Sequence, residues 1–498
     1  MEKTTLRLHT GFEIGEVDRR IFGGFLEHMG RCVYEGVYDP GSAHADANGY
    51  RTDVLEALRR LAMPVMRYPG GNFASGYHWQ DGVGPRNQRP TVRELAWQSI
   101  ETNEFGTEEF LTLCSMMGWT PMLAVNLGTG TPEEARNWVE YCNSPVGTRY
   151  ADLRAANGSP EPHAVPLWCL GNEMDGPWQL GHVPAEAYAI RAQQAAKMMR
   201  DVDRSIDLVL CGSCMPDLDS YLAWDRTVLE HVGGLVDYIS LHRYVGNEAD
   251  DTADFLAVTN SIDRQIAEMD AVCRFVQGRR RSKRRAYLCF DEWNVWYKAR
   301  QPSDMDGAGK RAPHLVEEVY NLEDALVVSG FFNSFLRRAD AVKIANIAQI
   351  VNVIAPLQTR GDDLLVQSIF HVFEMYAKRQ GGRSLQVLTD GPTYRGATNG
   401  DVTTIDSAAI VDGDRLHVFL TNRSLTEDAL VTIDVADHGV ATLVDGEIVD
   451  GDDPKAANRF GQPDVVVARP FTEVTVRGGV VETTLPPLSV AALTLQLS

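Results

Sequence analysis

The chain has 498 residues, 44% of them hydrophobic, and carries a formal net charge of −21 at pH 7. This length and apolar content suffice for a large domain and a smaller one. The negative charge disfavours binding to nucleic acid and to anionic lipid, and no stretch reaches the roughly eighteen apolar residues that a membrane helix needs. We therefore expect two domains and neither nucleic-acid nor membrane partners.

The first residues, MEKTTLRLHTGFEIGE, alternate polar and apolar side chains and contain no apolar core of a secretion signal. This pattern predicts a cytoplasmic location. Of eight cysteines, Cys114, Cys169, Cys211 and Cys289 lie in or beside apolar stretches, where thiols serve as small hydrophobes. Cys211 and Cys214 have a CxxC spacing, but a zinc site would need a second such pair. We therefore expect buried, reduced cysteines.

Eight short β-rich segments recur through the first three quarters of the chain, each followed by a helical pattern. They span residues 21–29, 65–73, 120–128, 166–174, 207–213, 236–244, 285–294 and 342–350. Amphipathic helices are predicted between them, including residues 52–61, 106–117, 131–142 and 184–202. Eight such units favour a closed (β/α)8 TIM barrel, an α/β fold, over an open sheet.

Beyond about Gly381 the helical periodicity stops, and alternating runs separated by Gly/Asp turns predict an antiparallel, jelly-roll-like β-sandwich. These runs span residues 408–424, 429–437, 464–478 and 488–497. We therefore expect a catalytic barrel over residues 15–375 and a sandwich over 376–498, joined by an N-terminal strand at 3–12. The basic run at 279–285 precedes the seventh strand and predicts a solvated loop at the barrel's N-terminal face.

Polar side chains end nearly every predicted barrel strand. Because the C-terminal strand ends of such a barrel meet at one pocket, these side chains predict a site for a polyhydroxylated ligand. In chain order they are Glu27, Asn72, Asn126, Asn172, Glu173, Ser213, His242, Tyr244, Glu292, Asn294 and Gln349.

Glu173 and Glu292 end the fourth and seventh strands and can face one point across the barrel mouth. Retaining hydrolysis of a glycosidic bond needs two carboxyl groups about 5 Å apart, one a nucleophile and one a proton donor. Trp178 follows Glu173 closely, and a partly dry cleft beside it would keep that carboxyl protonated, so Glu173 is the better acid/base. Glu292 is then the nucleophile, with the hydroxyl of Tyr244 as the nearest donor.

Other residues predict contacts with the sugar. Asn172, directly before the acid, would face the 2-hydroxyl, where a hydrogen bond that tightens in the transition state lowers the barrier. Aromatic walls for sugar faces are expected from Trp97, Trp178, Trp293 and Trp296. His242 is more consistent with a hydrogen-bonded wall residue than with a catalytic base, because the carboxylates fill both catalytic roles.

Structural alternatives stay open for several of these residues. Glu27 could form a salt bridge with Arg67 instead of binding sugar, and Asn72, which follows two glycines, could simply shape a turn. Trp296 could be core packing. Burial of both Glu173 and Glu292 without a function would be costly, which favours catalysis.

Long motifs resemble one known family, the intracellular α-L-arabinofuranosidases of glycoside hydrolase family 51. The resemblance runs almost end to end and includes FGGFLEHMGRCVYEGVYDP, MRYPGGNFASGYHWQDGVGP, ETNEFGTEEF, LAVNLGTGTPEEARNWVEYCN, CLGNEMDGPWQLGH, SLHRYVGN, DEWNVWY and ANIAQIVNVIAP. It implies Glu173 as acid/base and Glu292 as nucleophile. It also implies substrate contacts by Glu27, Asn72, Asn172, Tyr244 and Gln349, and aglycone contacts by Trp97 and Trp296.

The resemblance further implies that arabinofuranose-containing oligosaccharides are the substrates. It implies that no metal or organic cofactor is needed, and that the chain assembles as a homo-oligomer, commonly a hexamer. The segment at 302–313 could alter which aglycone fits.

Competing functions remain at this point. Another retaining barrel glycosidase, such as an endo-glucanase or a β-xylosidase, would use the same carboxylate pair. A non-catalytic carbohydrate-binding protein could keep the pocket, although retention of both carboxylates argues against it. A metal-dependent hydrolase would want a His-x-His pair at the first strand end, and a Schiff-base enzyme a lysine at a strand end, whereas Lys343 begins its strand.

Overall fold

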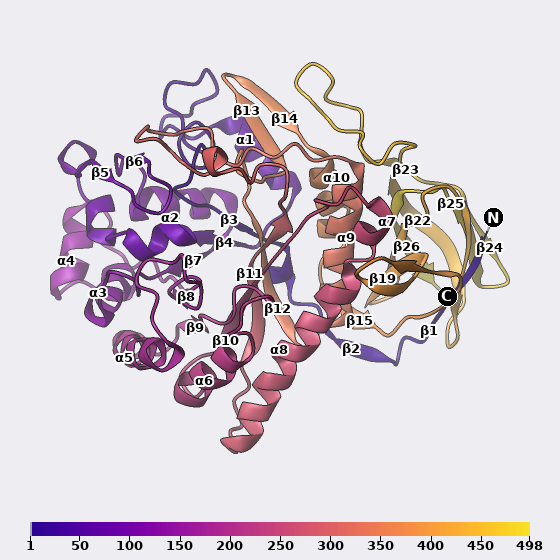
Figure 1. The fold of residues 1–498 in the computed structure, drawn as a ribbon, viewed down its shortest axis with the longest axis horizontal. Helices are drawn as coiled ribbons and strands as arrows, with labels where there is room; N and C mark the ends of the chain where they lie inside the picture. Colours follow the sequence, from indigo (N-terminus) through magenta and orange to yellow (C-terminus); the bar gives the residue numbers. More distant parts are fainter. Residues whose placement is uncertain (1) are drawn as a thin grey trace.

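The computed structural model describes residues 2–498, and its larger part is built on a closed barrel of eight parallel strands (Figure 1). Each strand falls in, or within one residue of, a predicted segment. They are β3 (Gly23–Phe25), β4 (Val65–Tyr68), β7 (Thr120–Ala124), β8 (Leu167–Leu170), β9 (Asp207–Leu210), β10 (Tyr238–Val245), β11 (Tyr287–Val295) and β12 (Val342–Ala348). Pairing of β12 with β3 closes the barrel, so the predicted fold class is confirmed.

Helices surround the barrel. The four predicted ones match to within one residue: α1 (Thr52–Arg60), α2 (Thr107–Met117), α3 (Pro132–Asn143) and α5 (Ala185–Val202). The start of α3 shows why, since the Thr131 side chain accepts a hydrogen bond from the Glu134 amide and Pro132 occupies the first helical position. The others are α4 (Arg149–Ala156), α6 (Ala223–Val232), α7 (Thr252–Leu256), α8 (Thr259–Arg279), α9 (Leu322–Arg337) and α10 (Ser368–Ala377).

The second part is a sandwich of two sheets with a shared hydrophobic core. One sheet has the order β16 (Leu388–Asp390), β1 (Glu2–Leu8), β21 (Ala429–Val435), β25 (Val480–Leu485), β24 (Val474–Arg477). The other has the order β2 (Glu13–Glu16), β15 (Arg383–Leu385), β19 (Ile405–Asp412), β20 (Arg415–Asn422), β26 (Ser489–Leu497), β22 (Val440–Val449), β23 (Arg469–Pro470). The N-terminal strand thus adds to the sandwich, as expected.

Two details of the sandwich differ from expectation. The pair β1–β21 is parallel, because β1 enters from the far end of the chain and not through a hairpin. In the run predicted as strand at 464–478, residues 464–468 are irregular. The side chain of Asn458 holds them there, because its Nδ2 donates to the Val466 carbonyl and its Oδ1 accepts from the Val466 amide. The predicted domain boundaries stay a prediction, and β2 pairs with β15 in the seven-stranded sheet.

Helices α9 and α10 lie between the barrel and the sandwich (Figure 1). A partly buried ion pair links the two parts, with Arg337 Nη1 on α9 2.9 Å from Asp406 Oδ1 on β19. Small two-stranded sheets sit on the loops: β5 (Val92–Arg93) with β6 (Ile100–Glu101), β13 (Leu357–Arg360) with β14 (Asp363–Val366), and β17 (Thr393–Gly396) with β18 (Gly400–Thr403).

The cysteines and the basic run match their predictions. All eight cysteines are buried free thiols. The basic run precedes β11, at the barrel's N-terminal face, where Arg279 lies 2.9 Å from Glu230 and Arg284 pairs with Asp237. Within residues 2–498, no helix combines the length and the apolar character that crossing a membrane requires.

Candidate active site

A cavity of about 780 Å³ lies at the C-terminal ends of the barrel strands. Nine of the ten residues predicted to be catalytic or to contact the substrate line it: Glu27, Asn72, Trp97, Glu173, His242, Tyr244, Glu292, Trp296 and Gln349. The exception, Asn172, is buried just behind the lining, where its Oδ1 accepts from Arg67 and its Nδ2 donates to Asn72 Oδ1 at 3.3 Å. The barrel topology therefore brings these distant residues to one place.

Glu173 stands on a tight turn after β8. Its backbone is in the left-handed region, with φ of 44°, and its carbonyl accepts from the Gly176 amide at 2.8 Å. Trp178 lies beside the carboxyl as expected, but it contributes a donor as well as an apolar wall: its indole Nε1 is 2.7 Å from Glu173 Oε2. The Trp178 side chain is 47% exposed, so one edge of the acid's surroundings faces solvent.

Glu292 lies on β11 among positive charge and donors. Arg67 Nη1 donates to its Oε1 at 2.7 Å, and the Tyr244 hydroxyl donates to its Oε2 at 2.9 Å. Burial raises the pKa of Glu292 above its ordinary value, while the charges of His242 and Arg67 oppose that rise. These donors favour the ionised form that a nucleophile requires.

Gly71 permits the chain to approach Glu292 closely. A Cβ on Gly71 would lie 2.6 Å from Glu292 Oε1, a distance that forbids any side chain unless the carboxylate moves. The second glycine of the PGGN motif after β4 thus allows the backbone to pack directly against the Glu292 carboxylate. Asn72 begins a short 3₁₀ helix and also lines the cavity, so its structural and binding roles are compatible.

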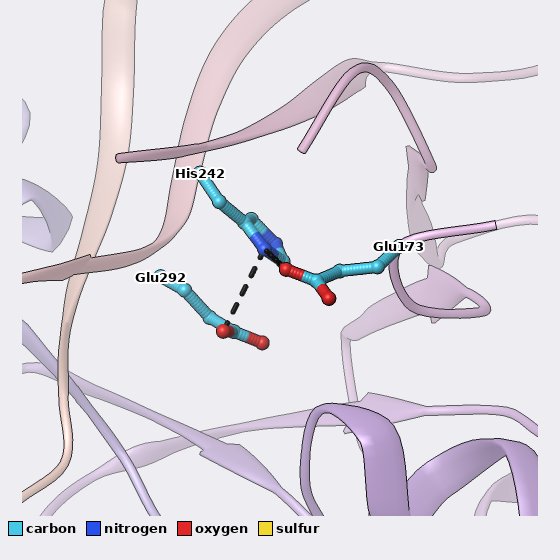
Figure 2. Close-up of side chains that lie close together, drawn as sticks. All are labelled: Glu173, His242 and Glu292. Carbon is cyan, nitrogen blue, oxygen red and sulfur yellow. Dashed lines mark hydrogen bonds and ion pairs between the residues drawn. The ribbon is translucent and has the colours of Figure 1, made fainter. Parts of the chain in front are cut away.

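His242 lies beside both glutamates and contacts each of them (Figure 2). Its Nδ1 is 2.9 Å from Glu173 Oε1 and 3.6 Å from Glu292 Oε2, and one oxygen of each carboxylate and this nitrogen lie within 4.8 Å of one another. Three donor atoms this close could suit a cation. Here, however, the 2.9 Å contact is a hydrogen bond, and Arg67 already places a positive charge against Glu292.

A bulge in β11 explains how His242 reaches a third carboxylate. Ser240 pairs with Cys289 and His242 with Glu292, so β11 has one residue more than β10 over this stretch. The neighbouring Asp291 can therefore also face the histidine, and its Oδ1 lies 3.1 Å from His242 Nε2. Although burial raises its pKa, the charges of Arg67 and His242 bring the pKa of Asp291 below its ordinary value.

Glu27 is fully enclosed at the other side of the cavity. Its Oε1 accepts from the Phe73 amide at 3.1 Å and from Trp97 Nε1 at 3.2 Å, and its Oε2 accepts from Gln349 Nε2 at 3.1 Å. Burial and the charge of Glu292 raise the pKa of Glu27 to about 8. The possible salt bridge from Glu27 to Arg67 is wrong, because Arg67 pairs instead with Asp291 and Glu292.

Three of the four tryptophans considered as walls line the cavity: Trp97, Trp178 and Trp296. Trp296 is held by its Nε1 donating to the Ala299 carbonyl at 2.9 Å, and Arg300 lies over its ring. Trp293, which was also expected to form a wall, does not line the cavity. It is fully buried among phenylalanines of α9, because strand alternation turns it away from the cavity that Glu292 faces.

Some strand-end polar residues do not line the cavity, contrary to expectation. Asn126 Oδ1 accepts from three successive loop amides, Ser213 bonds to Asp225, and Asn294 Nδ2 donates to the carbonyls of Ala348 and Ile354. Asn126 and Asn294 therefore satisfy backbone groups of the loops, and Ser213 donates to a buried carboxylate on α6.

Two of the charged residues around Glu292 and His242 are not predicted as site residues from the sequence. Arg67 is expected there only as a possible partner of Glu27, and Asp291 is not expected there. Both carry a signal in the sequence, since a charge inside an apolar strand requires a buried partner. The partner's identity depends on which strands become neighbours across the barrel, and that is a tertiary property.

A (β/α)8 barrel with two carboxyl groups so close at the ends of its fourth and seventh strands has the site of a glycoside hydrolase. Comparison with known proteins names the particular family. Residues 57–261 match the α-L-arabinofuranosidase 1 domain, and residues 291–489 match the α-L-arabinofuranosidase C-terminal domain.

Full-length relatives agree. The chain is 41% identical to an intracellular exo-α-(1→5)-L-arabinofuranosidase of Acetivibrio thermocellus, over 93% of this chain and 94% of the relative. It is 40% identical to an exo-α-(1→6)-L-arabinofuranosidase of Bifidobacterium longum, over 99% and 97%. A solved family 51 α-L-arabinofuranosidase from Bifidobacterium longum superposes with a TM-score of 0.95 at 34% identity, covering 99% of both chains. The chain therefore belongs to the α-L-arabinofuranosidases of glycoside hydrolase family 51.

Proposed function

We propose that the protein is a retaining, exo-acting α-L-arabinofuranosidase that removes terminal non-reducing α-L-arabinofuranosyl residues from arabino-oligosaccharides by double displacement. The observation that carries this proposal is the approach of a Glu173 oxygen to within 4.8 Å of a Glu292 oxygen. Retaining glycosidases hold their carboxyl groups about 5–5.5 Å apart, whereas inverting ones leave room for a water between them.

The chemistry follows from the contacts of the two residues. Glu292, held by Arg67 and Tyr244, attacks the anomeric carbon, while Glu173 gives a proton to the leaving oxygen. Once the aglycone has left, the Glu173 carboxylate takes a proton from water, which attacks the glycosyl-enzyme and releases arabinose with its original configuration. Glu27, Asn72, Asn172 and Gln349 are proposed to bind the sugar, with Trp97 and Trp296 flanking the aglycone.

The test replaces Glu292 with alanine. Hydrolysis of 4-nitrophenyl α-L-arabinofuranoside is expected to fall by about 10⁴-fold or more. Added azide should then restore turnover and give an azide product of inverted configuration, which NMR identifies. Glu56→Ala, at an exposed position of α1, is the control. Undiminished hydrolysis by Glu292→Ala, or an inverted product from the wild type, contradicts the proposal.

The same NMR assay with pyranosides distinguishes the competing functions. An endo-glucanase or a β-xylosidase would prefer aryl pyranosides, and a binding protein would turn over neither class. The proposal covers terminal α-L-arabinofuranosyl residues without naming the bond that joins them to the next sugar, because one relative is named for α-(1→5) and another for α-(1→6) bonds.

Location and assembly are proposed from the relatives and the resemblance. One relative is named as intracellular, which supports a cytoplasmic location. A homo-oligomer, specifically a hexamer, is proposed from the family resemblance. Size-exclusion chromatography with light scattering measures the mass directly.

A further inference from the structure

His242 has a position that sugar binding does not explain. It is buried, and its two ring nitrogens face three carboxylates: Nδ1 faces Glu173 at 2.9 Å and Glu292 at 3.6 Å, and Nε2 faces Asp291 at 3.1 Å. Figure 2 shows the ring beside both proposed catalytic groups. A wall residue would need one hydrogen-bond partner, not an anion at each end of the ring.

The hydrogen-bond partners of His242 and Glu173 leave one position for the proton that these two residues share. Asp291 accepts from Nε2, so this nitrogen keeps its proton. The indole of Trp178 can only donate, so Glu173 Oε2 is an acceptor. The remaining proton then lies between His242 Nδ1 and Glu173 Oε1, on one atom or the other.

The charges around the ring keep this proton in place near neutral pH. Burial opposes a charged imidazole, but the negative charges of Glu292 and Asp291 overcome it and raise the pKa of His242 well above its ordinary value. The charged or titratable groups that contact this cluster are Glu173 after β8, Asp291 and Glu292 on β11, Arg67 on β4 and Tyr244 on β10. Three more groups interact with its carboxyl groups electrostatically: Glu27 with Glu292, and Asp175 and Cys214 with Glu173.

We propose that His242 holds the proton that Glu173 delivers to the leaving group, and that Asp291 orients the imidazole for this exchange. The proposal rests on the proposed function and adds a proton store to its acid/base. His242 acts through Glu173 and is therefore a positioning and relay residue, whereas Glu173 touches the reacting bond.

The steps balance. In glycosylation the proton shared by Nδ1 and Oε1 moves through Glu173 to the glycosidic oxygen. The bond from the anomeric carbon to that oxygen breaks, the oxygen keeps the electron pair, and a bond to Glu292 forms. In deglycosylation water loses a proton to Glu173 while its oxygen attacks the anomeric carbon. The ester bond to Glu292 breaks, and the proton returns to the line between Oε1 and Nδ1.

The test compares His242→Asn with the wild type on aryl α-L-arabinofuranosides, from 2,4-dinitrophenol to phenol as leaving group. Asparagine can still donate to Glu173, but it cannot exchange a proton. For the phenyl substrate kcat/KM should fall by about 10²-fold or more, and for the dinitrophenyl substrate by less than about 10-fold, since a good leaving group needs no proton.

The opposite pattern overturns the proposal. An equal loss with all leaving groups would mean that His242 acts only through its charge on Glu292, and an unchanged phenyl rate would mean that it plays no part. Trp178→Phe is the matched variant, because it removes the donor to Oε2 and leaves the Nδ1–Oε1 pair in place. It should therefore keep the solvent isotope behaviour of the wild type.

A measurement on the wild type does not depend on whether a variant folds. In heavy water the rate with the phenyl substrate should fall by about 1.5-fold or more and the rate with the dinitrophenyl substrate should not change, because the proton shared by Nδ1 and Oε1 moves only when the leaving group needs it. Equal rates in light and heavy water with the phenyl substrate overturn the relay. A wild type that hydrolyses no furanoside overturns the proposed function instead, so the two failures are distinguishable.

Discussion

Glu173 and Glu292 are the same amino acid at the ends of two strands of one barrel, yet their surroundings differ. Glu292 lies inside a strand, with Arg67 at 2.7 Å from one oxygen and a tyrosine hydroxyl at 2.9 Å from the other. Glu173 stands on a turn after its strand, against a half-exposed indole and a histidine. A fixed cation suits a group that must stay ionised, whereas exchangeable neighbours suit a group that must gain and lose a proton.

Of the changes that test this difference in surroundings, the replacement of Glu173 has the largest expected effect. In Glu173→Ala the proton donor is lost, so kcat/KM for a phenyl or oligosaccharide leaving group should fall by about 10²- to 10⁴-fold. A dinitrophenyl substrate should be affected far less during glycosylation. Steady-state and burst kinetics with both leaving groups measure the difference. Uniform loss across leaving groups would assign Glu173 a role other than the acid.

A smaller effect is expected from disturbing Glu292 alone. Gly71→Ala places a Cβ 2.6 Å from Glu292 Oε1, so the carboxylate must move by a fraction of an ångström. Misplacement of a nucleophile on this scale should lower kcat by about 10- to 100-fold for good and poor leaving groups alike. Gly278→Ala, where a Cβ has open space, is the control. Selective loss with poor leaving groups would contradict the division of roles.

The last prediction concerns stability instead of activity and involves Glu27, a third buried carboxyl, which has no ion-pair partner comparable to the Arg67 that pairs with Glu292. Its pKa is raised to about 8 from 4.5, so the folded state keeps a proton that the unfolded chain loses between these values. Its contribution to stability is therefore present below pH 4.5 and lost as the pH rises to 8, by at most about 5 kcal/mol.

Urea unfolding of Glu27→Gln at pH 4.5 to 8 measures this effect, because glutamine does not titrate. Relative to that variant, the free energy of unfolding of the wild type should decline with rising pH. If the two curves stay parallel, Glu27 is ionised in the folded state at neutral pH.

Much of the fold could be predicted from the sequence because its signals are local. The alternation of short apolar strands with amphipathic helices identifies the eight barrel strands, and cap residues such as Thr131 and Pro132 mark helix starts. Where local order was ambiguous the prediction failed. The run at 464–468 has strand-like composition, but tertiary contacts with Asn458 hold it in an irregular path.

The candidate site likewise has features that the sequence predicts and features that it does not. A carboxylate at a strand end is visible in the sequence, and so is the convergence of barrel strand ends, which together place Glu173 and Glu292 on one cavity. Trp293 was misplaced because adjacent residues of a strand face opposite sides, so that Trp293 points away from the cavity that Glu292 faces. Asn126 and Asn294 were misplaced because their loops take up their hydrogen bonds.

By itself the sequence determined the class of fold, the family and the two strand-end carboxyl groups proposed as catalytic, since each is encoded in local pattern or in continuous motifs. Only the tertiary structure decided that Arg67 forms an ion pair with Glu292 and that the ring of His242 contacts both Asp291 and Glu173. The physical reason is that the state of a buried charge depends on the charges within a few ångströms, and these come from strands far apart in the chain.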